Sequence, residues 1–162
     1  MTTDAGAEVI AVLTARGLTI AVAESLTGGL LVAELIKTPG ASAAVTGGVV
    51  AYNTALKHSV LGVDAELLAS RGAVDPEVAR QMATGVRTAL AVDGRPADIG
   101  ISTTGVAGPD PQDGHPVGTV FLGFAIENRA SSVALHLSGS RDDIRNAVVS
   151  ESLMQLTRLL NE

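Results

Sequence analysis

Apolar residues along the chain follow two spacings, one typical of helices and one typical of buried strands. Val9 and Leu13 lie on one helical face. Arg16-Gly17 then supplies a basic last turn and a glycine cap, so a helix is predicted over residues 4–16. Residues 18–23 form a short apolar run rich in β-branched side chains, which predicts a strand covered on both faces.

The same alternation continues to the end of the chain. Asp75-Pro76-Glu77 gives a strong helix start, because a capping acid, a proline at the first helical position and an acid near the helix dipole come together. The run 45–52, with two glycines, predicts a second buried strand. Residues 117–126 and 131–137 predict an antiparallel pair joined by a short turn. The other predicted elements are a strand over 98–104 and helices over 30–37, 54–61, from 64 onward, and 141–160.

Strands that alternate with helices and end in a hairpin and a helix are typical of a three-layer α/β/α sandwich. We therefore expect an α/β fold with a mixed, mostly parallel sheet of about five or six strands. The 162 residues suit one core, so a single domain over 1–162 is predicted. Aromatic residues make up only 2% and there are 18 glycines, so the core must rely on small aliphatic side chains and close backbone approach.

Charge and composition exclude several classes of function. A formal net charge of -6 argues against nucleic-acid binding, because phosphate neutralisation requires clustered lysines and arginines. A small anionic ligand stays compatible, since one pocket can be locally positive. There is no cysteine, and no histidine pair has metal-site spacing, so neither a metal nor another cofactor is expected. No apolar run approaches the roughly 20 residues that cross a bilayer, and residues 1–4 lack a basic signal region; we expect no membrane association and a cytoplasmic location.

Ligands in open α/β sheets gather beyond the carboxyl ends of the strands, and three such ends carry unusual residues. The first places Ser25 before Gly28-Gly29, which open a helix. This arrangement can expose the serine hydroxyl and direct backbone N–H groups toward a phosphate or an oxyanion. The alternative is that Ser25 or Thr27 only caps the helix.

The second strand end holds Tyr52, Asn53 and Lys57. Lys57 falls in about the first turn of the next predicted helix, where the positive end of the dipole disfavours the ammonium form. A neutral lysine can act as the base for a serine. The alternative is a solvated lysine and a half-buried tyrosine.

The third strand end combines hydroxyls and glycines over residues 103–109, and the alternative there is a simple glycine-proline turn. Near the last helix start, Arg141 and Arg145 lie one turn apart and can grip a phosphate. Alternatively they are surface arginines beside the first-turn acids Asp142 and Asp143. The predicted substrate-binding residues are Thr27, Gly28, Gly29, Asn53, Thr104, Gly105, Ala107, Gly108, Arg141 and Arg145.

Five segments occur in an order that resembles the CinA C-terminal domain family over nearly the whole chain. They are Ala23-Glu24-Ser25-Leu26-Thr27-Gly28-Gly29, Tyr52-Asn53 with Lys57, Gly72-Ala73-Val74, Thr104-Gly105-Val106-Ala107-Gly108-Pro109 and Pro116-Val117-Gly118-Thr119-Val120. The best-understood members of this family are α/β/α-sandwich amidases that convert nicotinamide mononucleotide to nicotinic acid mononucleotide and ammonia in pyridine nucleotide recycling. The resemblance implies this substrate and reaction, with Ser25 as the nucleophile and Tyr52 and Lys57 associated with it.

The resemblance leads to a mechanism and also leaves alternatives. We hypothesise that Lys57 deprotonates Ser25 while Tyr52 positions or relays the proton. The absence of the molybdopterin-binding-like domain that precedes this domain in many relatives makes the chain similar to the stand-alone form, and a homo-oligomer is expected. Where many relatives continue the third loop with glycines, this chain has Asp110-Pro111-Gln112-Asp113. The competing hypotheses are a non-catalytic nucleotide-binding module and a partner-binding protein in DNA uptake or damage response.

Overall fold

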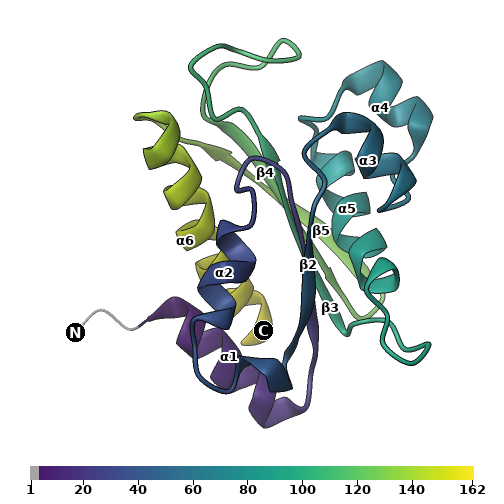
Figure 1. The fold of residues 1–162 in the computed structure, drawn as a ribbon. Helices are drawn as coiled ribbons and strands as arrows, with labels where there is room; N and C mark the ends of the chain where they lie inside the picture. Colours follow the sequence, from purple (N-terminus) through teal and green to yellow (C-terminus); the bar gives the residue numbers. More distant parts are fainter. Residues whose placement is uncertain (1–3) are drawn as a thin grey trace.

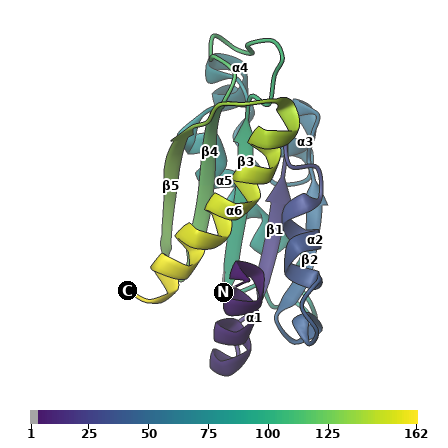
Figure 2. The same cartoon turned by 90° about the vertical axis from the view of Figure 1, so that its left-hand side faces the viewer.

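The computed structural model describes residues 4–162 and places five strands side by side in one sheet, in the order β2-β1-β3-β4-β5 (Figure 1, Figure 2). β1 pairs in parallel with β2 and β3, whereas β3–β4 and β4–β5 are antiparallel. The predicted mixed sheet of about five or six strands is confirmed with five, but two of its four strand pairs are antiparallel, so it is not mostly parallel as predicted. The strands are β1 (Ile20–Glu24), β2 (Val45–Val50), β3 (Ile99–Gly105), β4 (Thr119–Ile126) and β5 (Arg129–His136).

Helices cover both faces of this sheet, which confirms the predicted α/β/α layering. α1, α2 and α6 pack together on one face, and α5 lies on the other, with α3 and α4 on the same side as α5 (Figure 1). A short 3-10 helix, η1 (Ala41–Ala43), was not predicted. The helices are α1 (Ala5–Arg16), α2 (Leu30–Ile36), α3 (Thr54–Ser59), α4 (Ala65–Arg71), α5 (Pro76–Ala89) and α6 (Arg141–Leu160).

The helix ends follow the capping residues of the sequence. Asp75 accepts hydrogen bonds from the N–H groups of Glu77 and Val78, which fixes the start of α5 where it was predicted. Ser140 and Asp143 form a reciprocal capping box at the start of α6. Because α6 begins at this box, its first turn is held at the same end of the sheet as the carboxyl end of β1 (Figure 2).

Glycines allow α5 to lie directly on the sheet. A Cβ added at Gly100 of β3 would lie 1.8 Å from the carbonyl oxygen of Ala83, and one at Gly123 of β4 would lie 2.0 Å from that of Ala79. Both oxygens belong to α5, so the helix backbone touches the strands at these two points. The expectation of a core built on close backbone approach is confirmed here.

The second strand differs from its prediction. It ends at Val50 and pairs only with β1, so it is an edge strand and not one buried on both faces. Val50 is 46% exposed, whereas every residue of β1 is buried as expected. The hairpin turn is also shorter than predicted, since β5 begins at Arg129. No helix within residues 4–162 has the length and apolar character needed to span a bilayer, and residues 1–3 of the predicted domain lie outside the described residues.

Candidate functional site

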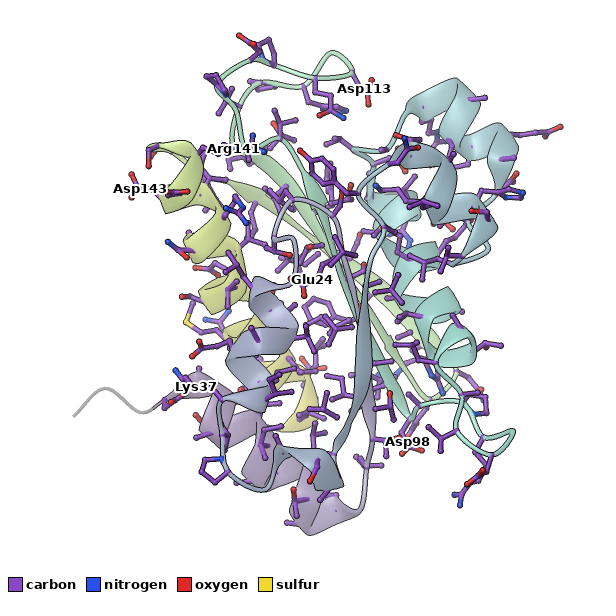
Figure 3. The ribbon with its side chains drawn as sticks, in the orientation of Figure 1. Glu24, Lys37, Asp98, Asp113, Arg141 and Asp143 are labelled. Atoms are coloured by element: carbon purple, nitrogen blue, oxygen red, sulfur yellow. The ribbon has the colours of Figure 1, made fainter. Side chains whose placement is uncertain are left out.

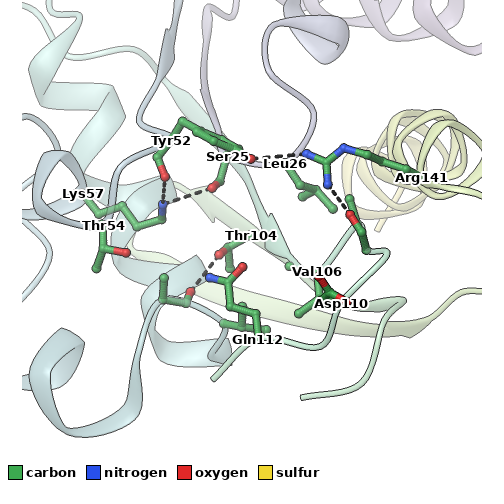
Figure 4. Close-up of a pocket in the computed structure, with 15 residues that line it drawn as sticks. Ser25, Leu26, Tyr52, Thr54, Lys57, Thr104, Val106, Asp110, Gln112 and Arg141 are labelled. Carbon is green, nitrogen blue, oxygen red and sulfur yellow. Dashed lines mark hydrogen bonds between the residues drawn. The ribbon is translucent and has the colours of Figure 1, made fainter. Parts of the chain in front are cut away.

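A pocket of about 190 Å³ opens where β1 and β3 end, between the β2–α3 connection, the loop after β3 and the first turn of α6 (Figure 4). Its position agrees with the rule that open sheets place ligands beyond the carboxyl ends of their strands. The lining includes two residues of the divergent loop, Asp110 and Gln112. The predicted site residues that line it are Ser25, Tyr52, Lys57, Thr104, Gly105, Ala107, Gly108 and Arg141.

Ser25 and Lys57 are in direct contact inside this pocket. The Nζ of Lys57 donates to the Oγ of Ser25 at 3.0 Å. The same Nζ donates to the carbonyl oxygen of Ala51 at 2.7 Å. It also donates to the carbonyl oxygen of Tyr52 at 3.5 Å, and Figure 4 shows this bond together with the bond to Ser25. Lys57 is only 1% exposed and Ser25 only 7%. The serine hydroxyl therefore has a buried amine as its neighbour, 32 residues away along the chain.

Burial changes the protonation of this amine. Removal from water lowers the pKa of Lys57 from 10.5 to about 8, because a buried ammonium is poorly solvated. Among residues 4–162, no carboxylate forms an ion pair with Lys57 that would offset this effect. The sequence predicts that the helix dipole lowers this pKa; burial is the cause in the structure, and Lys57 lies in the last turn of the six-residue α3.

The contacts of Lys57 suit a neutral amine. A neutral amine has two N–H donors and one lone pair. The carbonyl oxygens of Ala51 and Tyr52 can accept those two N–H bonds, which leaves the lone pair facing the hydroxyl of Ser25. In this state the hydrogen bond between the side chains runs from Ser25 to Lys57. The proton of the Ser25 hydroxyl then faces the lone pair of Lys57.

Glu24, which the sequence analysis did not single out, fixes the helix that follows Ser25. Its fully buried carboxylate accepts hydrogen bonds from the N–H of Leu31 at 2.8 Å and of Val32 at 3.1 Å (Figure 3). Glu24 therefore binds N–H groups at the start of α2, where the sequence analysis predicts a phosphate or an oxyanion. An acid at a strand end directly before a helix start was the signal available for this role.

The turn after Ser25 contributes no lining beyond Leu26. Thr27 is fully buried, and its Oγ1 lies 2.8 Å from the Oγ1 of Thr103 on β3. Gly28 and Gly29 adopt positive φ angles of 59° and 107°, which let the chain turn from β1 into α2. Thr27, Gly28 and Gly29 were predicted to bind substrate, but the structure places all three outside the pocket lining.

The three residues predicted at the second strand end make different contacts in the structure. Lys57 enters the pocket, whereas the side chain of Asn53 caps α3 by accepting from the N–H of Ala55 at 2.9 Å. The phenol oxygen of Tyr52 accepts from Arg141 at 3.3 Å, and only the backbone carbonyl of Tyr52 meets Lys57. The expected proton relay through the Tyr52 hydroxyl is therefore not the arrangement that this structure has.

Both predicted arginines of α6 bind backbone carbonyl groups, but only Arg141 also faces the pocket. Arg141 donates to the carbonyl oxygen of Gly108 and, as described above, to the phenol of Tyr52. Arg145 donates to the carbonyl oxygens of Leu26 and Thr27. Arg141 lines the pocket and Arg145 does not. Of the pair predicted to grip a phosphate, only Arg141 can reach a ligand there.

The loop after β3 closes the remaining side of the pocket. The Oγ1 of Thr104 donates to the carbonyl oxygen of Ala73 at 2.7 Å, which ties β3 to the segment before α5. Farther along, Gln112 and His115 pair across the tip of the loop. Within residues 4–162, no three side chains of the metal-binding types gather in one place.

These observations define an α/β/α protein with a buried serine–lysine pair at the carboxyl edge of its sheet. The model of the CinA C-terminal domain matches residues 2–160, and the chain belongs to this family. It is 47% identical over 152 residues to a CinA-like protein of Frankia casuarinae, a match that covers 94% of this chain and 34% of that longer protein. The chain thus spans about a third of the length of that protein and of a putative competence-damage inducible protein of Geobacillus kaustophilus.

Solved structures of the same superfamily share this fold. The competence damage-inducible protein A (ComA) of Klebsiella pneumoniae superposes with a TM-score of 0.91 at 34% identity, covering 98% of this chain and 96% of that one. The competence/damage inducible protein CihA of Agrobacterium tumefaciens superposes with a TM-score of 0.89 at 33% identity, covering 98% of this chain and 94% of that one. The fold of the chain is therefore that of CinA-superfamily proteins.

Proposed function

We propose that the chain hydrolyses the carboxamide of nicotinamide mononucleotide, with Ser25 as the nucleophile and Lys57 as its base. The observation that supports this proposal is the 3.0 Å contact between the Lys57 amine and the Ser25 hydroxyl inside the pocket. A serine attacks an amide only when a nearby base takes its proton, and a lysine can serve when burial keeps part of it neutral. The pKa of Lys57, lowered to about 8, meets this requirement.

The first half of the reaction forms an acyl-enzyme. The Oγ of Ser25 attacks the carboxamide carbon, and its proton passes to the neutral amine of Lys57. The carbonyl oxygen of the substrate takes the negative charge. When this oxyanion collapses, the C–N bond breaks and the ammonium of Lys57 returns the proton to the leaving nitrogen, which departs as ammonia.

The second half restores the enzyme. Water takes the place of ammonia, and Lys57 removes a proton from it as its oxygen attacks the acyl carbon. The bond to the Oγ of Ser25 then breaks, and Lys57 returns the proton to the serine. Nicotinic acid mononucleotide is released, and no metal or redox partner takes part in this scheme.

The pocket also suits the other parts of the substrate. Arg141 lines it with a guanidinium group, which pairs well with a phosphate. Tyr52 lies at the rim with 62% of its surface exposed, so its ring can cover a bound pyridinium ring, a cation that an aromatic face attracts. The carboxamide then points inward, toward Ser25.

The test is ammonia release from nicotinamide mononucleotide, compared with free nicotinamide and with the dinucleotide. The proposal expects turnover of the mononucleotide well above both of the others. Binding of the mononucleotide with no ammonia released would instead favour the non-catalytic nucleotide-binding module. Equal turnover of free nicotinamide would show that the nucleotide portion is not recognised.

A further inference from the structure

Arg145 binds backbone carbonyl oxygens of the turn that follows Ser25. Its Nε donates to the carbonyl oxygen of Leu26 at 2.8 Å, and its Nη2 donates to that of Thr27 at 3.4 Å. Gly28 lies against the same guanidinium, since a Cβ added there would be 3.4 Å from Nη2. One planar group from α6 therefore fixes the two consecutive peptides on either side of Thr27, one residue beyond Ser25.

These bonds determine where the N–H groups of the turn point. In a trans peptide the C=O and the N–H point in opposite directions. Because Arg145 binds the carbonyl of Leu26, the N–H of Thr27 is directed away from Arg145. In the same way, the bond of the Gly28 N–H to the carbonyl of Ser25 turns the N–H of Leu26 away from Gly28.

Neither of these two N–H groups has an acceptor within residues 4–162, although Leu26 is 4% exposed and Thr27 fully buried. Buried backbone N–H groups without partners are rare in folded proteins. Leu26 follows the nucleophile directly and lines the pocket. Donors placed beside a nucleophile in this way are suited to an oxygen that becomes negative during the reaction.

We infer that Arg145 is a positioning residue: by holding the two peptides that flank Thr27 it keeps the Gly28 N–H on the carbonyl of Ser25, and so directs the N–H of Leu26 toward the oxyanion formed at Ser25. This inference rests on the proposed function of Ser25 and replaces the expected phosphate contact of Arg145. Asp142 lies 3.8 Å from Arg145 but is 85% exposed, so the guanidinium is paired chiefly with the two backbone carbonyls.

The rate at which a small uncharged fluorophosphonate labels Ser25 tests this role without any nucleotide. Labelling joins the Oγ of Ser25 to phosphorus and expels fluoride, while the hydroxyl proton passes to Lys57. The phosphoryl oxygen of the probe gains negative charge as the carboxamide oxygen would. Arg145→Ala is expected to slow labelling about a hundredfold, the loss that a misplacement of about 1 Å causes. Arg158→Ala, an exposed arginine of the same helix, is the matched control and should label like the wild type.

Chemical rescue separates positioning from damage to the fold. Methylguanidinium should restore much of the labelling rate of Arg145→Ala, because it can occupy the vacated space and donate to the same carbonyls. Labelling of Arg145→Ala at the wild-type rate, or a loss that methylguanidinium does not recover, would overturn the inference. A wild-type protein in which Ser25 is not labelled at all would instead reject the proposed function.

Discussion

The amine of Lys57 lies 3.0 Å from the hydroxyl of Ser25 with no carboxylate paired to it among the described residues. A lysine buried without an acid differs from a structural ion pair, in which a nearby negative charge holds the ammonium form. Here poor solvation lowers the pKa of Lys57 with no opposing ion pair in the described part of the chain, and so favours the neutral amine. The first predictions follow from this relationship.

The pH dependence of ammonia release should report the protonation of Lys57. Its pKa is lowered from 10.5 to about 8, so the neutral amine is a minority near pH 7 and predominates above pH 8. The value of kcat/KM should therefore rise about tenfold per pH unit below pH 8 and level off above it. Initial rates between pH 6 and 9.5 measure this profile. A rate that stays constant over that range would show that another group is the base.

Replacing the nucleophile should remove activity and leave the fold intact. Ser25→Ala deletes one hydroxyl and should reduce ammonia release by several orders of magnitude, as the loss of a nucleophile does in serine hydrolases. Ser42→Ala, at an exposed position of η1, is the control and should keep full activity. Circular dichroism checks that both variants fold. A loss smaller than tenfold in Ser25→Ala would assign the attack to a different group.

Lys57→Arg should be nearly inactive even though it keeps a positive charge. Guanidinium stays protonated throughout the accessible pH range and cannot take the proton of Ser25. The rates at pH 9 are the most informative, because the wild-type lysine is then mostly neutral. Retained activity in this variant, with a pH profile like that of the wild type, would move the base away from residue 57.

Glu24→Gln should destabilise the fold by about 1–3 kcal/mol. The amide places one donor where the carboxylate accepts from Leu31 and Val32, so a buried N–H of α2 loses its partner. Urea unfolding measures the change. The control is Glu66→Gln at an exposed position of α4, for which we expect a change within about 0.5 kcal/mol. Equal stabilities of the two variants would contradict the role assigned to Glu24.

Gly123→Ala should cost about 1–3 kcal/mol in the free energy of unfolding, the range typical of overpacked cores. The added methyl group would lie 2.0 Å from the carbonyl oxygen of Ala79, and the α5 backbone must move to admit it. Gly48→Ala is a matched substitution in β2. Its nearest contact is the Val32 side chain at 3.0 Å, which can shift, so its cost should be smaller. Denaturant unfolding of both variants measures which one loses more stability.

Local patterns in the sequence were sufficient for most of the fold. Asp75-Pro76 and the capping residues of α6 depend only on neighbours along the chain, so those helices began where predicted. The prediction for β2 was wrong because an apolar run indicates a strand but not its place in the sheet. Val50 is 46% exposed and β2 has a neighbouring strand on one side only, an arrangement that depends on segments far along the chain.

The pairing of Ser25 with Lys57 could be predicted from the sequence, but the contacts that frame this pair could not. Ser25 follows β1 and Lys57 lies in the helix after β2, and the topology of open sheets brings the segments beyond these strand ends together. Whether an arginine or a glycine faces the pocket depends on contacts between distant segments. Arg145 meets Leu26 across 119 residues, and Glu24 points along α2 rather than into the pocket. Neither contact leaves a periodic signal in the sequence.

The bond between Arg145 and Leu26 links the reactive turn to the last helix of the fold. A polypeptide that has formed β1, β2 and α3 already holds serine beside lysine, yet its turn still lacks the brace that α6 supplies. On the proposed function, docking of α6 would then be the step that completes the reactive turn, and copies without it would attack amides more slowly.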